Sequence, residues 1–518
     1  MSENIAPAAQ AVSPRPAGSA GPLQYDVVVI GAGPVGENVA DRAGRTGLST
    51  VIVEAELVGG ECSYWACMPS KTLLRPGAAL AAARDVPGLT VAPTVDPGPV
   101  LAWRDEVTSD WDDAGQVEWL DGAGIALLRG HGRIVGPRRV EVTDPDGNRT
   151  LVEARYAVAV ATGSVPVLPE VPGLAEAAPW GSREATAAEE VPASVVVVGG
   201  GVVACEMATA YSDLGAHVTL LARHGLLGGA EPFAGEAVGA SLGELGVDVR
   251  LGASPVRVVR DGVGGPVTIT YRDDAGEHEV TAAELLVATG RVPRTQDVGL
   301  DTVGLTDVAR GLPVDEAMRV SGVEGGWLFA AGDVTGRVAT THQGKYQARV
   351  AGDVIAATFG SAPGDGGRSG DAVPVPATEE NRAAARAAEP WSRFAATADH
   401  AAQTQVVFTR PQVAWVGLSE RKAQEAGLDV RVVEYDLGWV AGAHVTGKSF
   451  AGRVSAVVDE ARRVLVGVTF VGPDAGEMLH AATVAVVGEV PLERLWHAVP
   501  AYPTVSEVWL RLLETYGL

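Results

Sequence analysis

Two stretches of the chain repeat one order of apolar and polar positions. The first, residues 25–54, runs from a β-branched apolar segment into the turn Gly31-Ala-Gly-Pro-Val-Gly36, then an alanine-rich helical segment and a second apolar segment. The second, residues 194–221, has the same order around the turn Gly199-Gly-Gly-Val-Val-Ala204. This order predicts a strand, a glycine turn, a helix and another strand, the βαβ unit that binds a dinucleotide. Two such units predict two bound dinucleotides.

The key positions of each turn have separate physical roles. The first glycine permits the tight bend, the second lets the backbone approach a pyrophosphate, and the third position allows the helix to pack closely on the strand. A glycine turn alone is weak evidence, but here each turn lies between an apolar strand and a helix. The positions are Gly31, Gly33 and Gly36 in the first unit and Gly199, Gly201 and Ala204 in the second.

The two units differ where the second strand ends. Glu54 ends this strand in the first unit, where an acid can accept a hydrogen bond from a ribose hydroxyl. The matching position in the second unit is Ala222, and Arg223 and His224 follow it. Because an arginine can pair with a 2′-phosphate there, the sequence favours NADPH over NADH. The alternatives are a solvated carboxylate at Glu54 and a surface Arg-His pair.

Composition narrows the class of protein and its compartment. Acidic residues outnumber basic ones, 64 against 40, and the formal net charge is −24, so no nucleic-acid or anionic-membrane partner is expected. No apolar run reaches the roughly 18 residues of a membrane span. Three cysteines suit a reducing compartment better than a secreted disulfide framework, so a cytoplasmic protein is expected. The histidines lack zinc-ligand spacing, so no metal site is predicted.

Further motifs and two irregular stretches divide the chain. The boxes Ala161-Thr-Gly163 and Ala288-Thr-Gly290 follow apolar runs and are typical of crossings between domains. Gly332-Asp333 follows another apolar run, where a strand end can meet a ligand. Residues 1–22 lack the basic and apolar regions of a signal peptide and are interpreted as a disordered leader. Residues 361–400 lack apolar periodicity and are interpreted as a flexible insertion.

A cysteine pair is the most specific chemical signal, in the segment Gly59-Gly-Glu-Cys62-Ser-Tyr-Trp-Ala-Cys67-Met-Pro-Ser-Lys71. At this spacing a regular helix would hold the two Cα atoms roughly 8–9 Å apart, beyond bridging range, so a disulfide requires a distorted turn. A helix start after two glycines can provide that turn. It also lowers the thiol pKa through the backbone dipole, which favours a nucleophilic thiolate. The alternative is two unrelated buried cysteines.

Together these motifs resemble those of the flavoprotein pyridine nucleotide-disulfide oxidoreductases, which include dihydrolipoyl dehydrogenase, glutathione reductase, mycothione reductase and mercuric reductase. The ending Pro503-Thr-Val-Ser-Glu507 adds to the likeness, which covers nearly all of the chain from Tyr25 onward. It implies that FAD is held by Gly31, Gly33, Gly36, Glu54, Lys71, Gly132, Gly163, Asp333 and Thr341. It implies that NADPH is held by Gly199, Gly201, Ala204, Arg223 and Gly290.

The resemblance also implies roles and an architecture. Cys67 would face the flavin, Cys62 would attack the substrate, and Lys71 and Glu206 would form an ion pair beside the flavin. The expected fold class is α/β, with two Rossmann-like dinucleotide-binding domains and a C-terminal α+β domain that makes a homodimer. The expected domains are residues 23–166 with 312–360 for FAD, 167–311 for the nicotinamide nucleotide, and 401–518 for dimerisation.

One departure from the family pattern changes the expected chemistry. Disulfide-reducing relatives read His-Pro-Thr where this chain has Tyr502-Pro503-Thr504, and a glutamate that matches Glu507 orients their histidine. A phenol with a pKa near 10 does not shuttle protons efficiently at neutral pH. Mercuric reductase also has a tyrosine here, but this chain lacks the C-terminal cysteine pair of that enzyme.

The leading hypothesis is an enzyme that passes electrons from NADPH through FAD to the Cys62–Cys67 disulfide and then to a small disulfide acceptor. The first alternative is a reductase of metal ions or quinones, suggested by Tyr502. The second is a non-catalytic flavin-binding redox sensor.

Overall fold

The computed structural model describes residues 21–361 and 375–518, which form two compact units. The first unit contains residues Met1–Cys62, Trp111–Val165 and Val292–Thr397, and the second contains Ser63–Asp110, Pro166–Arg291 and Ala398–Leu518. Apart from its last two residues, the predicted leader lies outside the described residues. Four short elements lie where the chain passes between the units: α2 (Gly60–Tyr64), η1 (Ser109–Trp111), β7 (Ser164–Pro166) and β15 (Arg291–Pro293).

A mixed sheet in the order β3-β2-β1-β6-β5-β4, with β16 also paired to β6, organises the first unit. Strands β3, β2, β1, β6 and β16 are parallel, whereas β5 and β4 form an antiparallel extension. The strands are β1 (Leu23–Ile30), β2 (Thr50–Glu54), β3 (Ala126–Arg129), β4 (His131–Gly136), β5 (Arg139–Thr143), β6 (Arg149–Val160) and β16 (Leu328–Ala330). Val27, Val28 and Val29 are completely buried in β1, as expected for a parallel strand covered on both faces.

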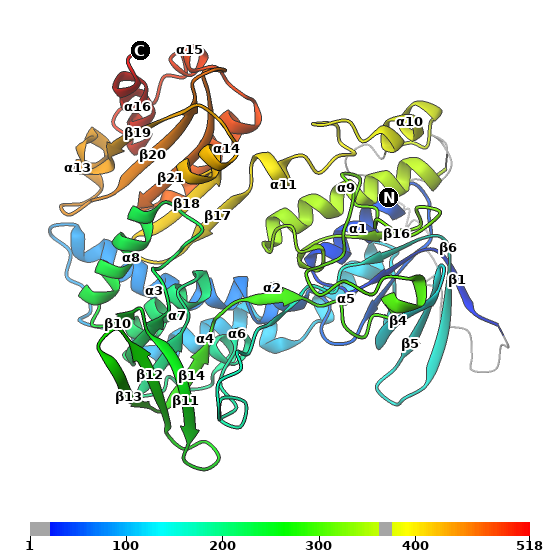
Figure 1. Ribbon diagram of the computed structural model, residues 1–518, viewed down its shortest axis with the longest axis horizontal. Coiled ribbons are helices and arrows are strands. Elements are labelled where there is room, and N and C mark those ends of the chain that lie inside the picture. The colour runs from blue at the N-terminus through cyan, green and yellow to red at the C-terminus, as the bar shows by residue number, and fades with distance from the viewer. Residues whose placement is uncertain (1–20, 362–374) are drawn as a thin grey trace, which may run out of the picture. The chain divides into compact units, whose positions relative to one another are not determined.

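Helices α1 (Pro34–Gly44) and α9 (Thr341–Phe359) pack side by side in the first unit (Figure 1). They approach closely at Gly352, where a Cβ atom would crowd the side chain of Arg42 and lie 3.1 Å from the carbonyl oxygen of Val39. The ion pair between Arg42 and Asp353 also joins them, at 2.7 Å. The remaining helices of this unit are α5 (Ala114–Gly122), α10 (Glu379–Ala387), η2 (Leu300–Val303) and η3 (Asp333–Thr335).

Helix α10 lies inside the stretch interpreted from the sequence as a flexible insertion. It begins at the N-cap Thr378, whose hydroxyl accepts a hydrogen bond from the Asn381 N–H, and its Ala385 is completely buried against the core that includes α9. An alanine contact gives little apolar periodicity, which explains the weak sequence signal. Residues 362–374 of the predicted insertion lie outside the described residues.

The second unit repeats the dinucleotide-binding pattern in a parallel sheet of order β10-β9-β8-β14. An antiparallel sheet, β11-β12-β13, lies next to it in the chain. The strands are β8 (Ser194–Val198), β9 (His217–Ala222), β10 (Asp248–Leu251), β11 (Ser254–Arg260), β12 (Val267–Asp273), β13 (Gly276–Ala282) and β14 (Glu284–Val287). The helices are α3 (Cys67–Asp85), α4 (Pro97–Val107), α6 (Ser182–Ala187), α7 (Val202–Asp213) and α8 (Pro232–Glu244).

The C-terminal part of the second unit is an antiparallel sheet of order β17-β18-β21-β20-β19. Helix α14 packs on β18 and β21, and α16 packs on β19 (Figure 1). The strands are β17 (Thr404–Val407), β18 (Gln412–Gly417), β19 (Val430–Asp436), β20 (Arg453–Asp459) and β21 (Val464–Gly472). The helices are α11 (Ala398–Ala401), α12 (Glu420–Glu425), η4 (Leu437–Trp439), α13 (Ala441–Thr446), α14 (Ala475–Val487), α15 (Leu492–Leu495), η5 (Val505–Glu507) and α16 (Val508–Tyr516).

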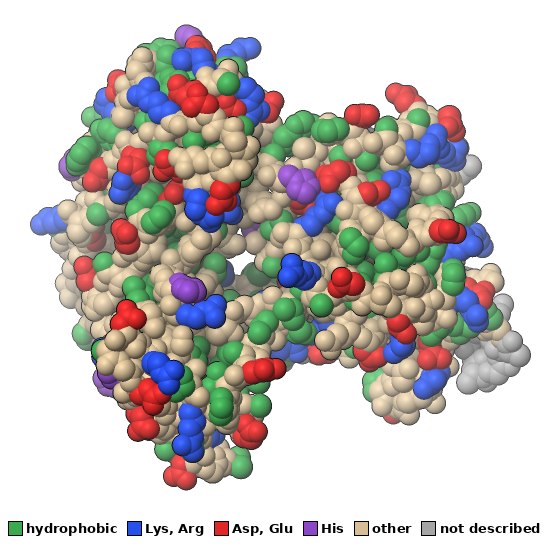
Figure 2. All heavy atoms as spheres, in the orientation of Figure 1, with side chains coloured by type: hydrophobic (Ala, Val, Ile, Leu, Met, Phe, Trp, Pro, Cys, Tyr) green, Lys and Arg blue, Asp and Glu red, His purple; other side chains and the backbone are tan. Residues whose placement is uncertain are grey.

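The surface charges are mixed on the face drawn in Figure 2, where Lys and Arg side chains are interspersed with Asp and Glu. Over residues 21–361 and 375–518, no helix is both long enough and apolar enough to cross a membrane. The same described residues contain no group of three or more His, Cys, Asp or Glu side chains that could hold a metal ion.

Candidate active site

The first glycine turn has a backbone that only glycine fits at two positions. Gly31 follows β1 with a φ of +102°, and a Cβ atom there would lie 2.5 Å from the carbonyl oxygen of Ala161. A Cβ atom at Gly36 would overlap the carbonyl oxygen of Gly31. Helix α1 starts after its N-cap Gly33, which has no side chain to cap the first N–H groups. The turn therefore forms an open cradle with helix N–H groups, which suits the pyrophosphate of a dinucleotide.

The carboxylate of Glu54 is fixed beside this turn by backbone donors. Its Oε2 atom accepts a hydrogen bond of 2.6 Å from the N–H of Ala32, and its Oε1 atom accepts one of 2.8 Å from the N–H of Glu56. The acid predicted to meet a ribose thus ends β2 next to the glycine turn. Gly132 lies in β4, where a Cβ atom would lie 3.0 Å from Cγ1 of Val53 and would push on β2.

Three further predicted residues come from segments that are distant in sequence. Gly163 follows β6 with a φ of +73°, and the hydroxyl of the next residue, Ser164, donates to Oδ2 of Asp333 at 2.6 Å. Thr341 is the first residue of α9. The N–H of Gly332 donates to Oε1 of Gln347 in α9 at 2.7 Å, which ties the Asp333 segment to that helix. The first unit therefore joins the Gly163, Asp333 and Thr341 segments.

Glu37 is a residue of this region that the sequence analysis did not select. It lies in the first turns of α1, half-buried, and no described residue is a hydrogen-bond partner of its Oε1 atom. Burial raises its pKa to about 7, the nearby Lys345 lowers it, and Glu54 raises it further. The signal that could have found it is an acidic residue directly after a glycine turn, on a helix otherwise packed in the protein.

The cysteine segment does not form one regular helix. Cys62 lies in α2, which ends at Tyr64, and Cys67 is the first residue of α3. Between them Ala66 has φ −136° and ψ −95°, far from helical values. Gly60 has a φ of +60°, and a Cβ atom there would lie 2.8 Å from Cα of Gly33. The start of the cysteine segment is therefore packed against the first glycine turn, and both cysteines are partly buried.

In the second unit the structure brings Lys71 and Glu206 together. The Nζ atom of Lys71 lies 2.8 Å from Oε2 of Glu206, whose side chain is 3% exposed. The N–H of Phe408 donates to the other carboxylate oxygen at 2.9 Å, and the Lys71 ammonium lies 5.0 Å from the centre of the Phe408 ring. Removing one member of such a buried pair leaves the other charge uncompensated.

The second glycine turn repeats the backbone of the first with different side chains. Gly199 has a φ of +139°, and a Cβ atom there would overlap the carbonyl oxygen of Ala288. Gly201 is the N-cap of α7, with nothing within 4 Å of a Cβ atom, and Ala204 is completely buried. Gly290 also has a positive φ, +136°, and its carbonyl oxygen accepts a hydrogen bond from the N–H of Val167.

Arg223 lies just beyond the end of β9, exposed to solvent. Its Nε atom donates to Nε2 of His224 at 3.2 Å. Cys205 lies on α7, completely buried, and burial raises its pKa to about 12. A neutral buried thiol is a packing group.

Tyr502 and Glu507 are held differently from each other. Tyr502 is 78% exposed. Glu507 is buried, and its carboxylate accepts hydrogen bonds from Arg511 at 2.5 Å and from the N–H of Ala441 at 3.3 Å. Within the described residues no hydrogen bond joins Tyr502 to Glu507. The partners of this glutamate are Arg511 and the N–H group at the start of α13.

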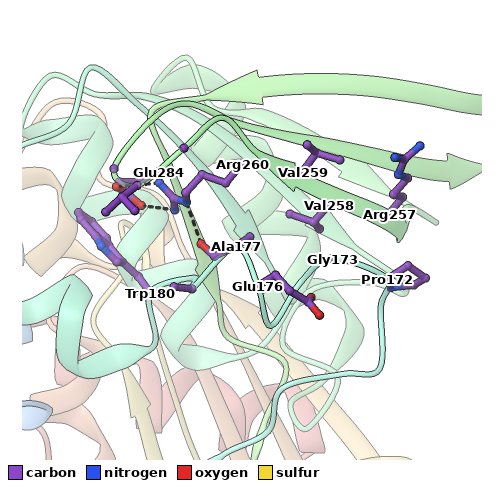
Figure 3. Close-up of a pocket in the computed structure, with 14 residues that line it drawn as sticks. Pro172, Gly173, Glu176, Ala177, Trp180, Arg257, Val258, Val259, Arg260 and Glu284 are labelled. Carbon is purple, nitrogen blue, oxygen red and sulfur yellow. Dashed lines mark hydrogen bonds and ion pairs between the residues drawn. The ribbon is translucent and has the colours of Figure 1, made fainter.

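A groove of about 720 Å³ lies elsewhere in the second unit, between β11 and the segment before Trp180 (Figure 3). In it Arg260 pairs with Glu284 at 2.8 Å and also donates to the carbonyl oxygen of Ala177. None of the residues predicted from the sequence as site residues lines this groove.

Comparison with known proteins agrees with this arrangement. Residues 25–348 match the family described as pyridine nucleotide-disulphide oxidoreductase, and residues 404–512 match the dimerisation domain of the same family. The chain belongs to the FAD-dependent pyridine nucleotide-disulfide oxidoreductase family, and it is an enzyme that uses FAD with a pyridine nucleotide. The expected α/β fold class, with its dinucleotide-binding region and C-terminal dimerisation domain, is confirmed.

The relatives cover almost the whole chain. A dihydrolipoyl dehydrogenase of Halobacterium salinarum is 32% identical over 94% of this chain and 95% of its own length. A mercuric reductase of Shigella flexneri is 32% identical over 96% of this chain and 82% of its own length. The solved HOCl-induced flavoprotein disulfide reductase RclA from Escherichia coli, as its Cu(II) complex, has a TM-score of 0.74 and 20% identity over 95% of this chain and 99% of its own. At that identity the match to RclA supports the fold alone.

Proposed function

We propose that this enzyme uses NADPH to reduce a disulfide-type acceptor through the pair Cys62 and Cys67, as a cytoplasmic homodimer. The observation that carries the proposal is the cysteine segment itself: two cysteines on either side of a break between α2 and α3, with its glycine start packed against the first glycine turn. When bound, FAD supplies the step that converts a two-electron hydride donor into a reductant of a disulfide.

The first glycine turn fits this cofactor because Gly31 and Gly36 permit a bend in which a Cβ atom would meet backbone carbonyl oxygens, and because the N-terminus of α1 has no side-chain cap. The proposed FAD residues are those given by the family pattern: Gly31, Gly33, Gly36, Glu54, Lys71, Gly132, Gly163, Asp333 and Thr341. Glu206 is proposed to act through its ion pair with Lys71, which holds that ammonium in place.

The two cysteines have different proposed roles. Cys67 begins α3, where the helix dipole stabilises a thiolate. Two electrons and two protons convert the Cys62–Cys67 disulfide into a dithiol. The Cys62 thiolate then attacks one sulfur of the acceptor disulfide and expels the other as a thiol. Cys67 displaces that mixed disulfide, which restores the Cys62–Cys67 bond and releases the second acceptor thiol.

NADPH is proposed as the nucleotide because the end of β9 lacks an acid. Ala222 is completely buried there, and exposed Arg223 follows it. An arginine at this position can bind a 2′-phosphate with charge-assisted hydrogen bonds. The other proposed residues for this nucleotide are Gly199, Gly201, Ala204 and Gly290.

A second function, reduction of a metal ion or a quinone, is favoured by one observation. Tyr502 is exposed and is not hydrogen-bonded to Glu507 in the part of the chain that the structure describes, so the histidine–glutamate arrangement of disulfide-reducing relatives has no counterpart here. The residue here is a tyrosine and not the proton-carrying histidine of those relatives. One relative is a mercuric reductase, which makes a soft metal ion a reasonable acceptor class.

Anaerobic titration of the purified protein with NADPH, and separately with NADH, tests these proposals. A long-wavelength charge-transfer band before the flavin absorbance is lost is expected, because the Cys67 thiolate would lie against oxidised flavin. The variant C62S should keep this band, C67S should lose it, and C205S should behave like the wild type. Loss of the flavin absorbance without the band would remove the cysteines from the electron path and favour the metal or quinone reductase.

A further inference from the structure

Glu37 is an acidic residue near the start of α1, where a negatively charged pyrophosphate is expected to bind. It is the fourth residue of α1, and its N–H makes the first regular helical hydrogen bond, to the carbonyl oxygen of Gly33 at 3.1 Å. Side chains on a helix lean toward its N-terminus. Glu37 therefore belongs to the first turns of α1, the helix whose N-terminus borders the cradle in which the family holds FAD.

The charged groups around Glu37 come from two neighbouring elements. Helix α9 contributes Lys345, which lowers the pKa of Glu37, and β2 contributes Glu54, which raises it. Helix α9 also carries His342, Arg349 and Asp353, of which Asp353 pairs with Arg42 of α1. Strands β1 and β6 contribute the ion pair of Asp26 with Arg155. Asp26 and Arg155 lie away from the carboxyl ends of their strands, where the glycine turn begins.

The carboxyl groups of Glu54 and Glu37 differ in their hydrogen bonding. Both carboxylate oxygens of Glu54 accept backbone hydrogen bonds. The Oε1 atom of Glu37 is buried without a hydrogen-bond partner among the described residues. A buried carboxylate oxygen in this state favours the protonated acid, which can also donate a hydrogen bond.

A bound pyrophosphate adds two negative charges at the N-terminus of α1. These charges repel a carboxylate over the first turn, but they attract the O–H of a carboxylic acid. We propose that Glu37 holds FAD as a neutral carboxylic acid, so that FAD binding takes up a proton and weakens as the pH rises. The inference rests on the FAD site of the family and not on the identity of the acceptor.

The direction of the pH dependence follows from the pKa of this group. Burial brings the Glu37 pKa to about 7 without any phosphate nearby. The added negative charges raise it further, so the bound state retains the proton to a higher pH than the empty site does. If the pKa rises by about one unit, the dissociation constant of FAD rises about tenfold across that window, and it is constant below it.

The test is equilibrium dissociation of FAD from the full-length protein between pH 6 and pH 9, followed by the fluorescence of released flavin. Proton uptake on rebinding of FAD is measured in parallel, by calorimetry in buffers of different ionisation enthalpy. The wild type should bind FAD about tenfold more tightly at pH 6 than at pH 9 and should take up a fraction of a proton at pH 7.5.

Variants separate Glu37 from the other groups. E37Q keeps the shape of the side chain but does not titrate, so its affinity for FAD should be independent of pH and its proton uptake should disappear. K345M removes the charge that lowers the Glu37 pKa and should move the pH midpoint upward while the slope remains. E56Q removes an exposed carboxylate of the same loop region and should keep the wild-type slope.

Two results would overturn the inference. A wild-type protein with no pH slope and no proton uptake would show that Glu37 does not change protonation when FAD binds. An unchanged slope in E37Q would assign the proton to another group. If the protein binds FAD at every pH, either of these results leaves the proposed function intact. If the protein does not bind FAD even at pH 6, both the proposed function and the inference about Glu37 are wrong.

Discussion

The two glycine turns have nearly the same backbone but carry different side chains at equivalent positions. Gly31 and Gly199 both have a positive φ, and a Cβ atom at each would meet the carbonyl oxygen of a residue in the box that follows a neighbouring strand. The residue after the third turn position is Glu37 in the first unit and Cys205 in the second. Burial raises the pKa of both, to about 7 and about 12. The backbone thus provides the dinucleotide cradle, and the side chains give each unit its own chemistry.

The largest expected difference concerns cysteines near the two turns. C67S removes the thiol at the start of α3 and should lower the NADPH-dependent reduction of a disulfide acceptor by at least about 1,000-fold, because the covalent step is lost. C205S changes a buried neutral thiol on α7 and should leave the rate within about twofold. Steady-state rates with matched flavin content check both variants. Comparable losses in the two would show that Cys205 also belongs to the electron path.

A second prediction compares the third position of each turn. G36A places a Cβ atom against the carbonyl oxygen of Gly31 and should destabilise the protein by about 3 kcal/mol, with loss of bound flavin. The second unit already has alanine at this position, so A204G should cost only about 1 kcal/mol, the usual effect of glycine in a helix. Urea unfolding of both variants provides the measurement. Equal destabilisation by the two changes would mean that the turns pack alike.

A third prediction compares Glu37 and Cys205 in protein freed of FAD. Because the folded-state pKa of Glu37 lies above its ordinary value of 4.5, the folded state binds the proton more strongly. Stability is therefore unaffected below about pH 4.5, falls as the pH rises toward 7, and stays reduced above it. E37Q should be more stable than the wild type by about 3 kcal/mol at pH 8 and equal to it at pH 4.

Thermal unfolding across this pH range measures that difference, and C205S serves as the control. Its thiol stays neutral in both folded and unfolded protein at pH 7 and below, so its stability relative to the wild type should not change with pH there. A constant difference between E37Q and the wild type at all pH values would mean that Glu37 is not protonated in the folded protein.

The sequence predicted what depends on local pattern. Strand, turn and helix of both dinucleotide units follow from apolar runs and glycines, and the structure has β1 with α1 and β8 with α7 at those places. The need for a distorted turn between Cys62 and Cys67 followed from helix geometry, and the two residues lie in different helices, Cys62 within α2 and Cys67 at the start of α3. Turns and helix breaks can be predicted from the sequence because only a few backbone conformations are compatible with such local patterns.

What the sequence did not reveal depends on contacts between distant segments. Glu37 is unusual because burial raises its pKa, and no local pattern shows that burial or the nearby charges of Lys345 and Glu54. Glu507 accepts a hydrogen bond from Arg511, whereas the family pattern alone assigned Glu507 to an active-site partner. Helix α10 was missed because it buries an alanine rather than a periodic apolar face. These features arise from packing, which single-residue patterns do not encode.

The smallest expected effect concerns the strand ends that distinguish the two nucleotides. R223A removes the exposed guanidinium after β9 and should lower kcat/KM for NADPH by roughly tenfold, the value of about 1.4 kcal/mol, while kcat/KM for NADH stays unchanged. R250A is a matched control, because Arg250 is an exposed arginine on the adjacent strand β10 that pairs with Asp248 at 2.8 Å. The loss of kcat/KM for NADPH in R223A should become smaller at high salt, since the contact between Arg223 and the 2′-phosphate would be exposed to solvent. An equal fall in kcat/KM for NADPH and NADH would mean that Arg223 contacts a part that the two nucleotides share. The difference between Glu54 and Ala222 at the strand ends would then no longer explain which nucleotide each unit prefers.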